Sequence, residues 1–461
     1  MKDVQMLDRT EGADAKTALL IIGGGASGVL LAAHVLHHMG DAPKGAVTIV
    51  EPTVALGQGI AYATTDPDHL LNTRVHNMSA FPDQPHHFAD WLAARPAYAG
   101  YDDHSFVPRM VYGAYLADLV AAPLADGRLI WRRARAVALR EGAAGVVARL
   151  DDGASLVADR AVLATGHVVP GTGDGLAASA WDNVSVDDQE GRVVIIGSGL
   201  SMVDQVLSLL KSGHRGPIVT VSRRGQMPRP HRPAAPLEIA ESDVPFGGTA
   251  SQLFAFARAQ ARRAEAQGGT WRDAVDGIRP YVRRIWASLD LAARKRLLKH
   301  ADVWWDVHRH RIPEASDTTI SAAMARGQLT QLRAAYLGAE RSAGQVIARL
   351  RPRGQRDEIS LPAAAIIDCR GIRNDPAAHA SPLMADLFGQ GVLRVDPLGI
   401  SPDVDADCHL RGKDGTSAAH ILAVGPVTRS AFWEITAVPD IRSQTWQVAQ
   451  DIAPLLVKAR I

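Results

Sequence analysis

Two glycine-rich turns, each placed between an apolar run and a helix-forming segment, constrain this chain of 461 residues more than any other feature. The first turn holds Gly23, Gly25 and Gly28 and follows the apolar run 18–22. The run predicts a buried parallel strand. The three glycines permit a tight turn, a close backbone approach to a pyrophosphate and close packing of the next helix on the strand. The alternative is a glycine-rich turn without a ligand.

The residues around this turn complete the pattern of a nucleotide-binding βαβ unit. Ser27 lies inside the turn, at the predicted N-terminus of the helix, where backbone N–H groups and the helix dipole attract phosphate. A second apolar run, 46–50, ends at Glu51. This acid lies near the spacing of roughly 20 residues that is typical of a ribose-binding carboxylate. Because strand, glycines, helix, strand and acid occur in this order, we predict a dinucleotide site.

A second, less complete fingerprint follows the apolar run 193–196. Gly197 and Gly199 form its turn, and Leu200 and Ser201 open the predicted helix. Met202 stands where the third glycine is expected. The order of strand, turn, helix and strand is nevertheless kept, so we predict a second dinucleotide site.

The strand after the second fingerprint ends in Arg223 and Arg224 instead of an acid. Guanidinium groups bind phosphate through charge-assisted hydrogen bonds, whereas a carboxylate would repel a 2′-phosphate. These arginines therefore predict that the second site prefers NADPH to NADH. The alternative is that they are ordinary solvated surface charges.

Two nucleotide sites in one chain are typical of hydride transfer from a nicotinamide to a flavin. The sequence has two cysteines, Cys369 and Cys408, and no C-x-x-C pair. This excludes the disulfide-reductase branch of such flavoproteins, which needs a thiol pair beside the flavin, and it fits a reducing compartment. A formal net charge of +1 argues against a nucleic-acid surface. We expect a cytoplasmic protein with no membrane segment and no metal site.

The order of predicted elements indicates an α/β fold with two Rossmann-like domains, the second inserted in the first. We expect the first domain to span 1–185 and 361–461 and the NADPH domain to span 186–360, with a helical insertion at about 249–326. Residues 129–164 predict three strands, and a single helix is expected over 291–303.

Several segments resemble a known family. They are 69–72, 78–82, 106–109, 112–113, 222–225, 228–231, 425–429 and 433–442. With the Thr165-Gly166 turn, they are similar to bacterial FAD/NAD(P)-binding oxidoreductases of the two-dinucleotide-binding-domain class, which has glutathione-reductase-type topology. Their relatives include flavin-dependent N-hydroxylating and Baeyer–Villiger-type monooxygenases.

The resemblance implies FAD at the first fingerprint and NADPH at the second. It also implies that further residues contact the cofactors: His69, Asn72, Met78, Ser79, Thr165, Gly166, Gly425, Pro426 and Pro439. The chain departs from the class at Gly425-Pro426, where the class usually carries Gly-Asp, so the usual ribityl carboxylate contact is in doubt. The substrate signatures of the N-hydroxylases and Baeyer–Villiger enzymes are not present as such.

Four residues are candidates for the catalytic pocket. Trp433, Glu434 and Arg442 lie in or beside the most specific matching segment. The run 438–440 predicts a helix start with Pro439 in its first turn, and a helix N-terminus at the flavin would stabilise the reduced ring. A plain helix start with a solvated arginine is the alternative. His231 lies in a basic, proline-rich loop that faces either an anionic or polar substrate or solvent, and the same choice holds for the basic run 308–311.

We expect an NADPH- and FAD-dependent single-component monooxygenase that hydroxylates a small polar substrate with O₂ through a C4a-(hydro)peroxyflavin. The alternatives are an NAD(P)H oxidase or reductase without oxygen insertion and a non-enzymatic redox-sensing flavoprotein. An amino compound and an anionic heterocycle both fit as substrates. The sequence gives no oligomeric state.

Overall fold

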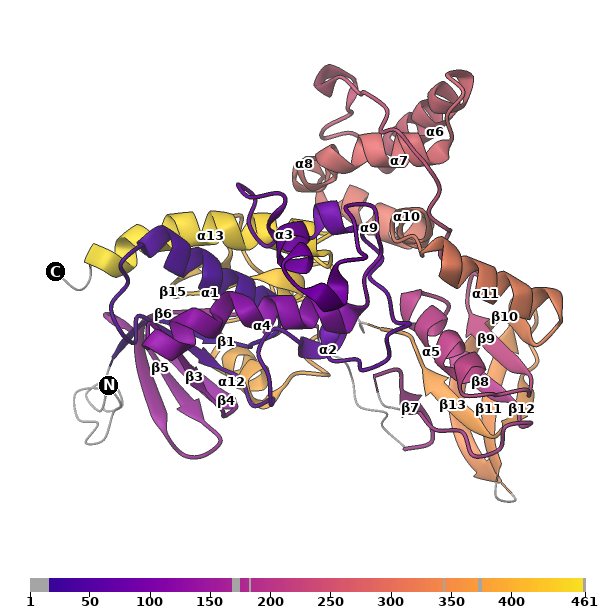
Figure 1. Cartoon of the computed structure of the whole chain (residues 1–461), viewed down its shortest axis with the longest axis horizontal. Coiled ribbons are helices and arrows are strands. Elements are labelled where there is room, and N and C mark those ends of the chain that lie inside the picture. The colour runs from indigo at the N-terminus through magenta and orange to yellow at the C-terminus, as the bar shows by residue number, and fades with distance from the viewer. Residues whose placement is uncertain (1–15, 168–174, 182–183, 343–344, 372–374, 459–461) are drawn as a thin grey trace. The chain divides into compact units, whose positions relative to one another are not determined.

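The chain forms two compact α/β units in a computed structural model that describes residues 16–167, 175–181, 184–342, 345–371 and 375–458 (Figure 1). The first unit comprises 1–65, 73–168 and 374–461. The second comprises 66–72 and 169–373. Each unit contains its own sheet. The two-domain α/β architecture expected from the two fingerprints is confirmed.

The sheet of the first unit has the strand order β14-β15-β6-β1-β2-β3. Its parallel strands are β15 (Ser417–Ala423), β6 (Ser155–Leu163), β1 (Thr17–Ile22), β2 (Val47–Val50) and β3 (Leu129–Arg132). The chain leaves β1 for β2 on one side, while β6 lies on the other. This switch point is where open α/β sheets bind ligands, at the carboxyl ends of the strands.

The remaining strands of this unit are antiparallel. They are β4 (Ala136–Gly142), β5 (Gly145–Leu150) and β14 (His409–Arg411). Residues 129–164 thus hold four strands, and the expectation of three is wrong. Gly145 has φ +139, which allows the chain to turn between β4 and β5 in two residues. This short turn makes two strands out of a continuous stretch of strand-forming sequence.

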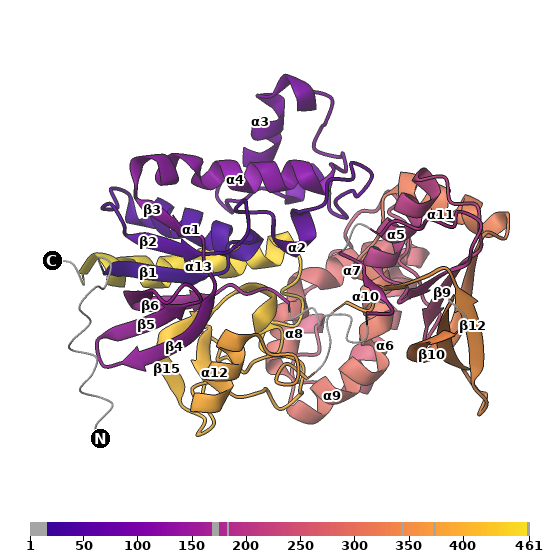
Figure 2. The same cartoon turned by 90° about the horizontal axis from the view of Figure 1, so that it is seen from below.

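Helices α13 (Val438–Lys458) and α4 (Arg109–Asp126) of the first unit pack against α1 (Ala26–Met39), whose first eleven residues are almost all buried. The others are α2 (Gly59–Tyr62), α3 (His87–Ala93) and α12 (Pro382–Gln390). α1 and α13 lie side by side in both views (Figures 1 and 2). The buried His34 of α1 meets Trp446 of α13 edge-on, with ring centroids 5.1 Å apart.

The sheet of the second unit has the order β12-β11-β10-β9-β8-β13-β7. Its strands are β7 (Ala178–Ser179), β8 (Val193–Ile196), β9 (Ile218–Ser222), β10 (Leu329–Ser342), β11 (Gln345–Pro352), β12 (Ile359–Ala363) and β13 (Ala365–Asp368). Along the sheet, the five neighbouring strands β10, β9, β8, β13 and β7 are parallel. Helix α5 (Leu200–Lys211) follows β8 and packs its apolar face into the core.

Six helices follow β9 before the chain returns to the sheet at β10. They are α6 (Ala250–Ala266), α7 (Trp271–Ile278), α8 (Val282–Ser288), α9 (Leu291–His300), α10 (Asp302–Arg309) and α11 (Glu314–Ala325). The predicted helical insertion is therefore present. The single helix expected over 291–303 is divided between α9 and α10, which are separated by Ala301.

The units divide the chain at other positions than the sequence suggested. Strand β13 pairs with β8, and β7 pairs with β13, so both belong to the second sheet. The expected boundaries near 185 and 360 fall inside the second unit, whose long segment runs from 169 to 373. The short segment 66–72 also belongs to the second unit.

Among the described residues, no helix has the length and apolar character needed to cross a membrane.

Candidate dinucleotide-binding sites

The turn after β1 requires glycine for steric reasons. Gly23 has φ +111, and a Cβ there would collide with the carbonyl oxygen of Ala164, just after β6. A Cβ at Gly28 would collide in turn with the carbonyl oxygen of Gly23. The turn therefore sits tightly between the ends of β1 and β6, with α1 packed directly against it, as the fingerprint predicts.

The N-terminus of α1 is open to a ligand. Its N-cap residue, Gly25, provides no side-chain hydrogen bond to the first N–H groups of the helix. A Cβ added at Gly59 would lie 3.2 Å from the Cα of Gly25. The two backbones thus line a narrow cradle that a side chain would fill, and such an uncapped N-terminus fits an anionic pyrophosphate.

Glu51 is held at the end of β2 beside this cradle. Its carboxylate accepts hydrogen bonds from the N–H of Gly24, at 2.7 Å, and of Thr53, at 3.1 Å. Trp131 donates its indole N–H to the Glu51 carbonyl at 3.0 Å. These contacts fix the carboxylate at the strand end where the fold places ribose hydroxyls.

The C-terminal segment packs against the same turn. Gly425 follows β15 with φ +76, and a Cβ there would collide with the hydroxyl of Ser27. Its N–H donates to the side-chain oxygen of Gln444 at 2.7 Å, and the Gln444 amide donates to the hydroxyl of Thr428 at 3.0 Å. Pro426 lies in the short 3₁₀ helix Gly425–Thr428. Gln444 of α13 therefore holds this segment beside Ser27.

Helix α13 begins at Val438, so the predicted helix start with Pro439 in its first turn is confirmed. Arg442 lies in the next turn and donates to the carbonyl of Ser79 at 2.9 Å. Burial lowers the pKa of Arg442. The Met78 side chain is buried next to this contact, so the structure brings together 78–79 and 442 from opposite ends of the sequence.

Trp433 and Glu434 lie between the Gly425–Thr428 helix and α13. Trp433 is buried and Glu434 is partly buried. Both belong to the first unit, in the segment that joins this short helix to α13.

A partly buried histidine follows the Thr165-Gly166 pair. Thr165 adjoins Ala164, whose carbonyl limits Gly23, and Gly166 has φ +68. Burial, together with the charge of Arg429, lowers the pKa of the next residue, His167, to about 3. His167 is therefore a neutral imidazole at the carboxyl end of β6.

The second fingerprint repeats the steric arrangement of the first. Gly197 has φ +113, and a Cβ there would collide with the carbonyl of Cys369, just after β13. The N-cap residue of α5, Gly199, provides no side-chain cap, and the space around it is open. Leu200 and Ser201 form the first turn of α5 and are partly buried, whereas Met202 lies fully buried in the core. The second turn therefore also offers an uncapped helix N-terminus.

The two predicted phosphate-binding arginines have different surroundings. Arg223 is exposed at the end of β9. Arg224 donates to the carbonyls of Lys299 and His300 at the C-terminus of α9. A cation there is favoured by the helix dipole. Arg223 is therefore the freer of the two for a ligand phosphate.

Three predicted residues have hydrogen bonds within the second unit. His69 is hydrogen bonded to the hydroxyl of Ser208 on α5 at 2.9 Å. The carbonyl of Asn72 accepts a hydrogen bond from Nε2 of His231 at 3.0 Å. The segment 66–72 is thus fastened both to α5 and to the basic loop after β9, and it belongs to the second unit, whereas it was expected in the first.

Sequence reasoning missed Gln444, Thr428, Gly59 and His167. Gln444, Thr428 and Gly59 act through contacts with residues distant in the sequence, and local spacing carries no such signal. His167 alone had one, because it directly follows the recognised Thr165-Gly166 pair.

Neither cysteine is placed for thiol chemistry. Cys369 and Cys408 are both buried and free, and they belong to different units. Burial, with Asp368 and Asp204 nearby, raises the pKa of the Cys369 thiol. A protonated, buried thiol is a poor nucleophile. In the described ranges, no three His, Cys, Asp or Glu side chains are grouped to hold a metal ion.

Comparisons with known proteins agree with this geometry. Residues 20–168 match an FAD-NAD(P)-binding family model. A sequence search of curated proteins returns no match.

Solved structures resemble the chain over almost its whole length. An ornithine hydroxylase from Pseudomonas aeruginosa has a TM-score of 0.64 at 16% identity and covers 95% of this chain and 99% of its own. An ornithine N-hydroxylase from Kutzneria sp. 744 has a TM-score of 0.64 at 14% identity, and the match covers 95% of this chain and 99% of that enzyme. An FAD-bound cadaverine monooxygenase from Erwinia amylovora has a TM-score of 0.62 at 14% identity, and the match covers 95% of each chain. The chain thus carries an FAD-NAD(P)-binding domain over residues 20–168, within the fold of the two-dinucleotide-binding-domain flavoproteins.

Proposed function

We propose that the chain is an NADPH- and FAD-dependent monooxygenase that hydroxylates a small polar substrate. The observation that carries the proposal is the repeated fingerprint, in which Gly23 and Gly197 occupy equivalent turns before uncapped helix N-termini. The ornithine hydroxylases and the cadaverine monooxygenase have this fold, which supports oxygen insertion as the outcome.

The residues of the first unit fit FAD. The N–H groups at the start of α1 bind the pyrophosphate, and Glu51 accepts hydrogen bonds from the ribose. The start of α13 and Arg442 would supply positive charge to the bound flavin, and the Ser79 carbonyl holds the arginine in place. Bound flavin supplies the redox chemistry, taking a hydride from NADPH and activating O₂.

The chain's own residues orient the reactants and exclude water. In the second unit, the start of α5 binds the NADPH pyrophosphate and Arg223 binds the 2′-phosphate. The fixed charge of Arg442 favours the reduced, anionic flavin ring. His167 is neutral at physiological pH and therefore adds no charge of its own.

Product analysis with ¹⁸O₂ tests oxygen insertion. The purified FAD-loaded protein would be supplied with NADPH and a panel of amino compounds and anionic heterocycles. The proposal predicts that at least one compound gives a product carrying one ¹⁸O atom, with hydrogen peroxide falling below one per NADPH consumed. Peroxide equal to NADPH for every compound would instead indicate an oxidase.

A protein that does not oxidise NADPH with O₂ as the only electron acceptor would be neither a monooxygenase nor an oxidase. If NADPH were oxidised only when an electron acceptor other than O₂ was added, the chain would act as a reductase. If NADPH did not react in any condition, a redox-sensing role would be favoured over an enzyme.

A further inference from the structure

Two basic segments that are distant in the sequence pair through their backbones in the second unit. The N–H of Arg229 donates to the carbonyl of Val307 at 3.0 Å, and the N–H of Ile312 donates to the carbonyl of Arg229 at 3.0 Å. His231 donates its N–H to the Ile312 carbonyl at 2.8 Å. The loop after β9 is therefore fixed against the junction of α10 and α11.

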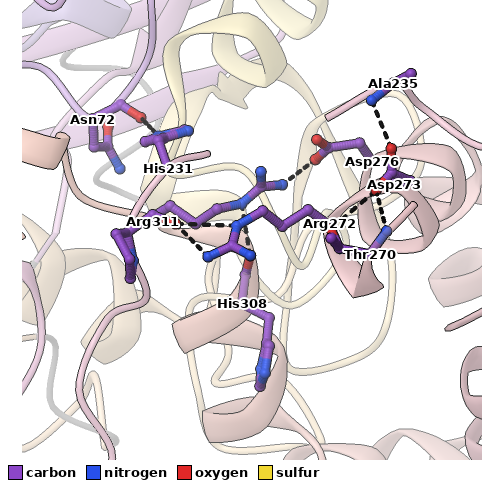
Figure 3. A network of polar contacts seen from close by, with 10 residues as sticks. Asn72, His231, Ala235, Thr270, Arg272, Asp273, Asp276, His308 and Arg311 are labelled. Atoms are coloured by element: carbon purple, nitrogen blue, oxygen red, sulfur yellow. Dashed lines mark hydrogen bonds and ion pairs between the residues drawn. The ribbon is translucent and has the colours of Figure 1, made fainter. Parts of the chain in front are cut away.

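Helix α7 adds a third basic group to this junction. Arg272 donates from Nε and Nη2 to the carbonyl of Pro230, at 3.2 and 3.0 Å. Its guanidinium also lies over the Trp271 ring, 4.3 Å from the centroid. Figure 3 shows Arg272 and Arg311 extending toward each other beside His231. The guanidinium of Arg272 is thus held in one orientation before any ligand arrives.

The cations in this cluster differ in whether they have a partner. The buried Arg311 is paired with Asp276, and the exposed Arg232 is paired with Glu314 at 3.0 Å. Within the described ranges, Arg229 and Arg272 form no ion pair. Burial lowers the pKa of Arg272, and the neighbouring charges of Arg311, Arg232 and Arg229 lower it further. Arg272 therefore keeps its charge in this cluster at an electrostatic cost.

An incoming anion would remove that cost. We propose that Arg229 and Arg272 form an oxoanion-binding site, which takes a phosphate or a carboxylate. A guanidinium fork matches either group through charge-assisted hydrogen bonds. The aromatic face of Trp271 and the backbone pairing preorganise the fork, so little side-chain entropy is lost on binding.

Two sources can supply this chemistry. One is the 2′-phosphate of NADPH, because the loop begins only a few residues after the end of β9. The other is an anionic group of the substrate, and this second source rests on the proposed function. The site itself needs no oxygen insertion, since binding can be measured without turnover.

Calorimetric titration of the full-length, oxidised, FAD-loaded protein distinguishes the sources. The test variant is R229M/R272M, and the matched control is R232M, because Arg232 lies in the same loop but already has a carboxylate partner. The probes are NADP⁺, NAD⁺ and inorganic phosphate, the last added to NADP⁺-saturated protein. R229M alone removes an exposed side chain and serves if the double variant does not fold.

A dinucleotide phosphate at the site predicts that R229M/R272M weakens NADP⁺ binding about 10- to 100-fold, the range for hydrogen bonds to charged groups, and leaves NAD⁺ unchanged. A substrate anion predicts unchanged NADP⁺ binding, together with phosphate binding to the NADP⁺-saturated protein that the variant loses. The proposal is overturned if the double variant binds every probe as the parent does, or if R232M has an equal effect.

Discussion

At the residue scale, the two halves of the chain share one steric device. The first glycine of each fingerprint has a positive φ and lies under a carbonyl from the neighbouring strand end, Ala164 for Gly23 and Cys369 for Gly197. An alanine at either position would face both backbone strain and a backbone collision.

Alanine substitution at each turn should therefore separate the two cofactors. We expect Gly23→Ala to abolish FAD retention, and Gly197→Ala to retain FAD but lose reduction by NADPH. Each substitution should cost roughly 1–3 kcal/mol of stability. Flavin absorbance after gel filtration and thermal melting measure these effects. Gly213→Ala is the control, because Gly213 has φ +88 but open space around it, and equal loss of NADPH reduction in this variant would contradict the steric account.

The paired arginines after β9 should not be equivalent. Arg223→Ala should raise the KM for NADPH about 10-fold and leave the KM for NADH unchanged, because it removes a charge-assisted contact to the 2′-phosphate. Arg224→Ala should mainly lower the melting temperature, since Arg224 binds the carbonyl end of α9. Initial rates with NADPH and NADH measure these effects. An unchanged preference for NADPH over NADH in the Arg223→Ala/Arg224→Ala double variant would refute the NADPH assignment.

At the element scale, α13 holds the short Gly425–Thr428 helix beside the glycine-rich turn that follows β1. Gln444 satisfies the buried N–H of Gly425 and the hydroxyl of Thr428 together. Gln444→Met should lower the free energy of unfolding by roughly 1–3 kcal/mol, because it leaves the buried N–H of Gly425 without a partner, while the Thr428 hydroxyl keeps its hydrogen bond to the Gly425 carbonyl. Urea denaturation measures the loss. Gln447→Met on the exposed side of the same helix is the control and should have little effect.

The packing of α1 on α13 should be sensitive to acid through His34. Burial lowers the pKa of His34 to about 4 from 6.5, with the Ala80 carbonyl and neighbouring histidines as smaller influences. A depressed folded-state pKa means that the unfolded chain takes up the proton first. Stability is therefore complete above pH 6.5 and falls as the pH drops toward 4, by roughly 3 kcal/mol. His34→Gln should flatten this part of the pH profile of unfolding, and an unchanged slope would contradict the assignment.

At the scale of the whole molecule, the sequence predicts most of what depends on local order. Both βαβ units, the helical insertion and the start of α13 follow from apolar runs, glycines and a proline at the expected spacings. The division into α9 and α10, the contact of Arg224 with α9 and the place of segment 66–72 depend on tertiary contacts instead. Single-residue spacing carries no information about such contacts, so these features could not be predicted.

The candidate sites follow the same rule. The glycines and Glu51 were predictable because a phosphate and a ribose impose a fixed order on one continuous segment. Gln444 and the pairing of Arg229 with Ile312 were not, because each joins segments that only the folded chain brings together.

The central claim is that two nucleotides meet on this chain, and anaerobic stopped-flow reduction tests it most directly. The FAD-loaded protein is mixed with NADPH or NADH while the flavin absorbance is followed. We predict that NADPH bleaches the flavin and does so at far lower concentrations than NADH, and that Gly197→Ala keeps its flavin but is not bleached. A flavin that neither nucleotide reduces would contradict the account.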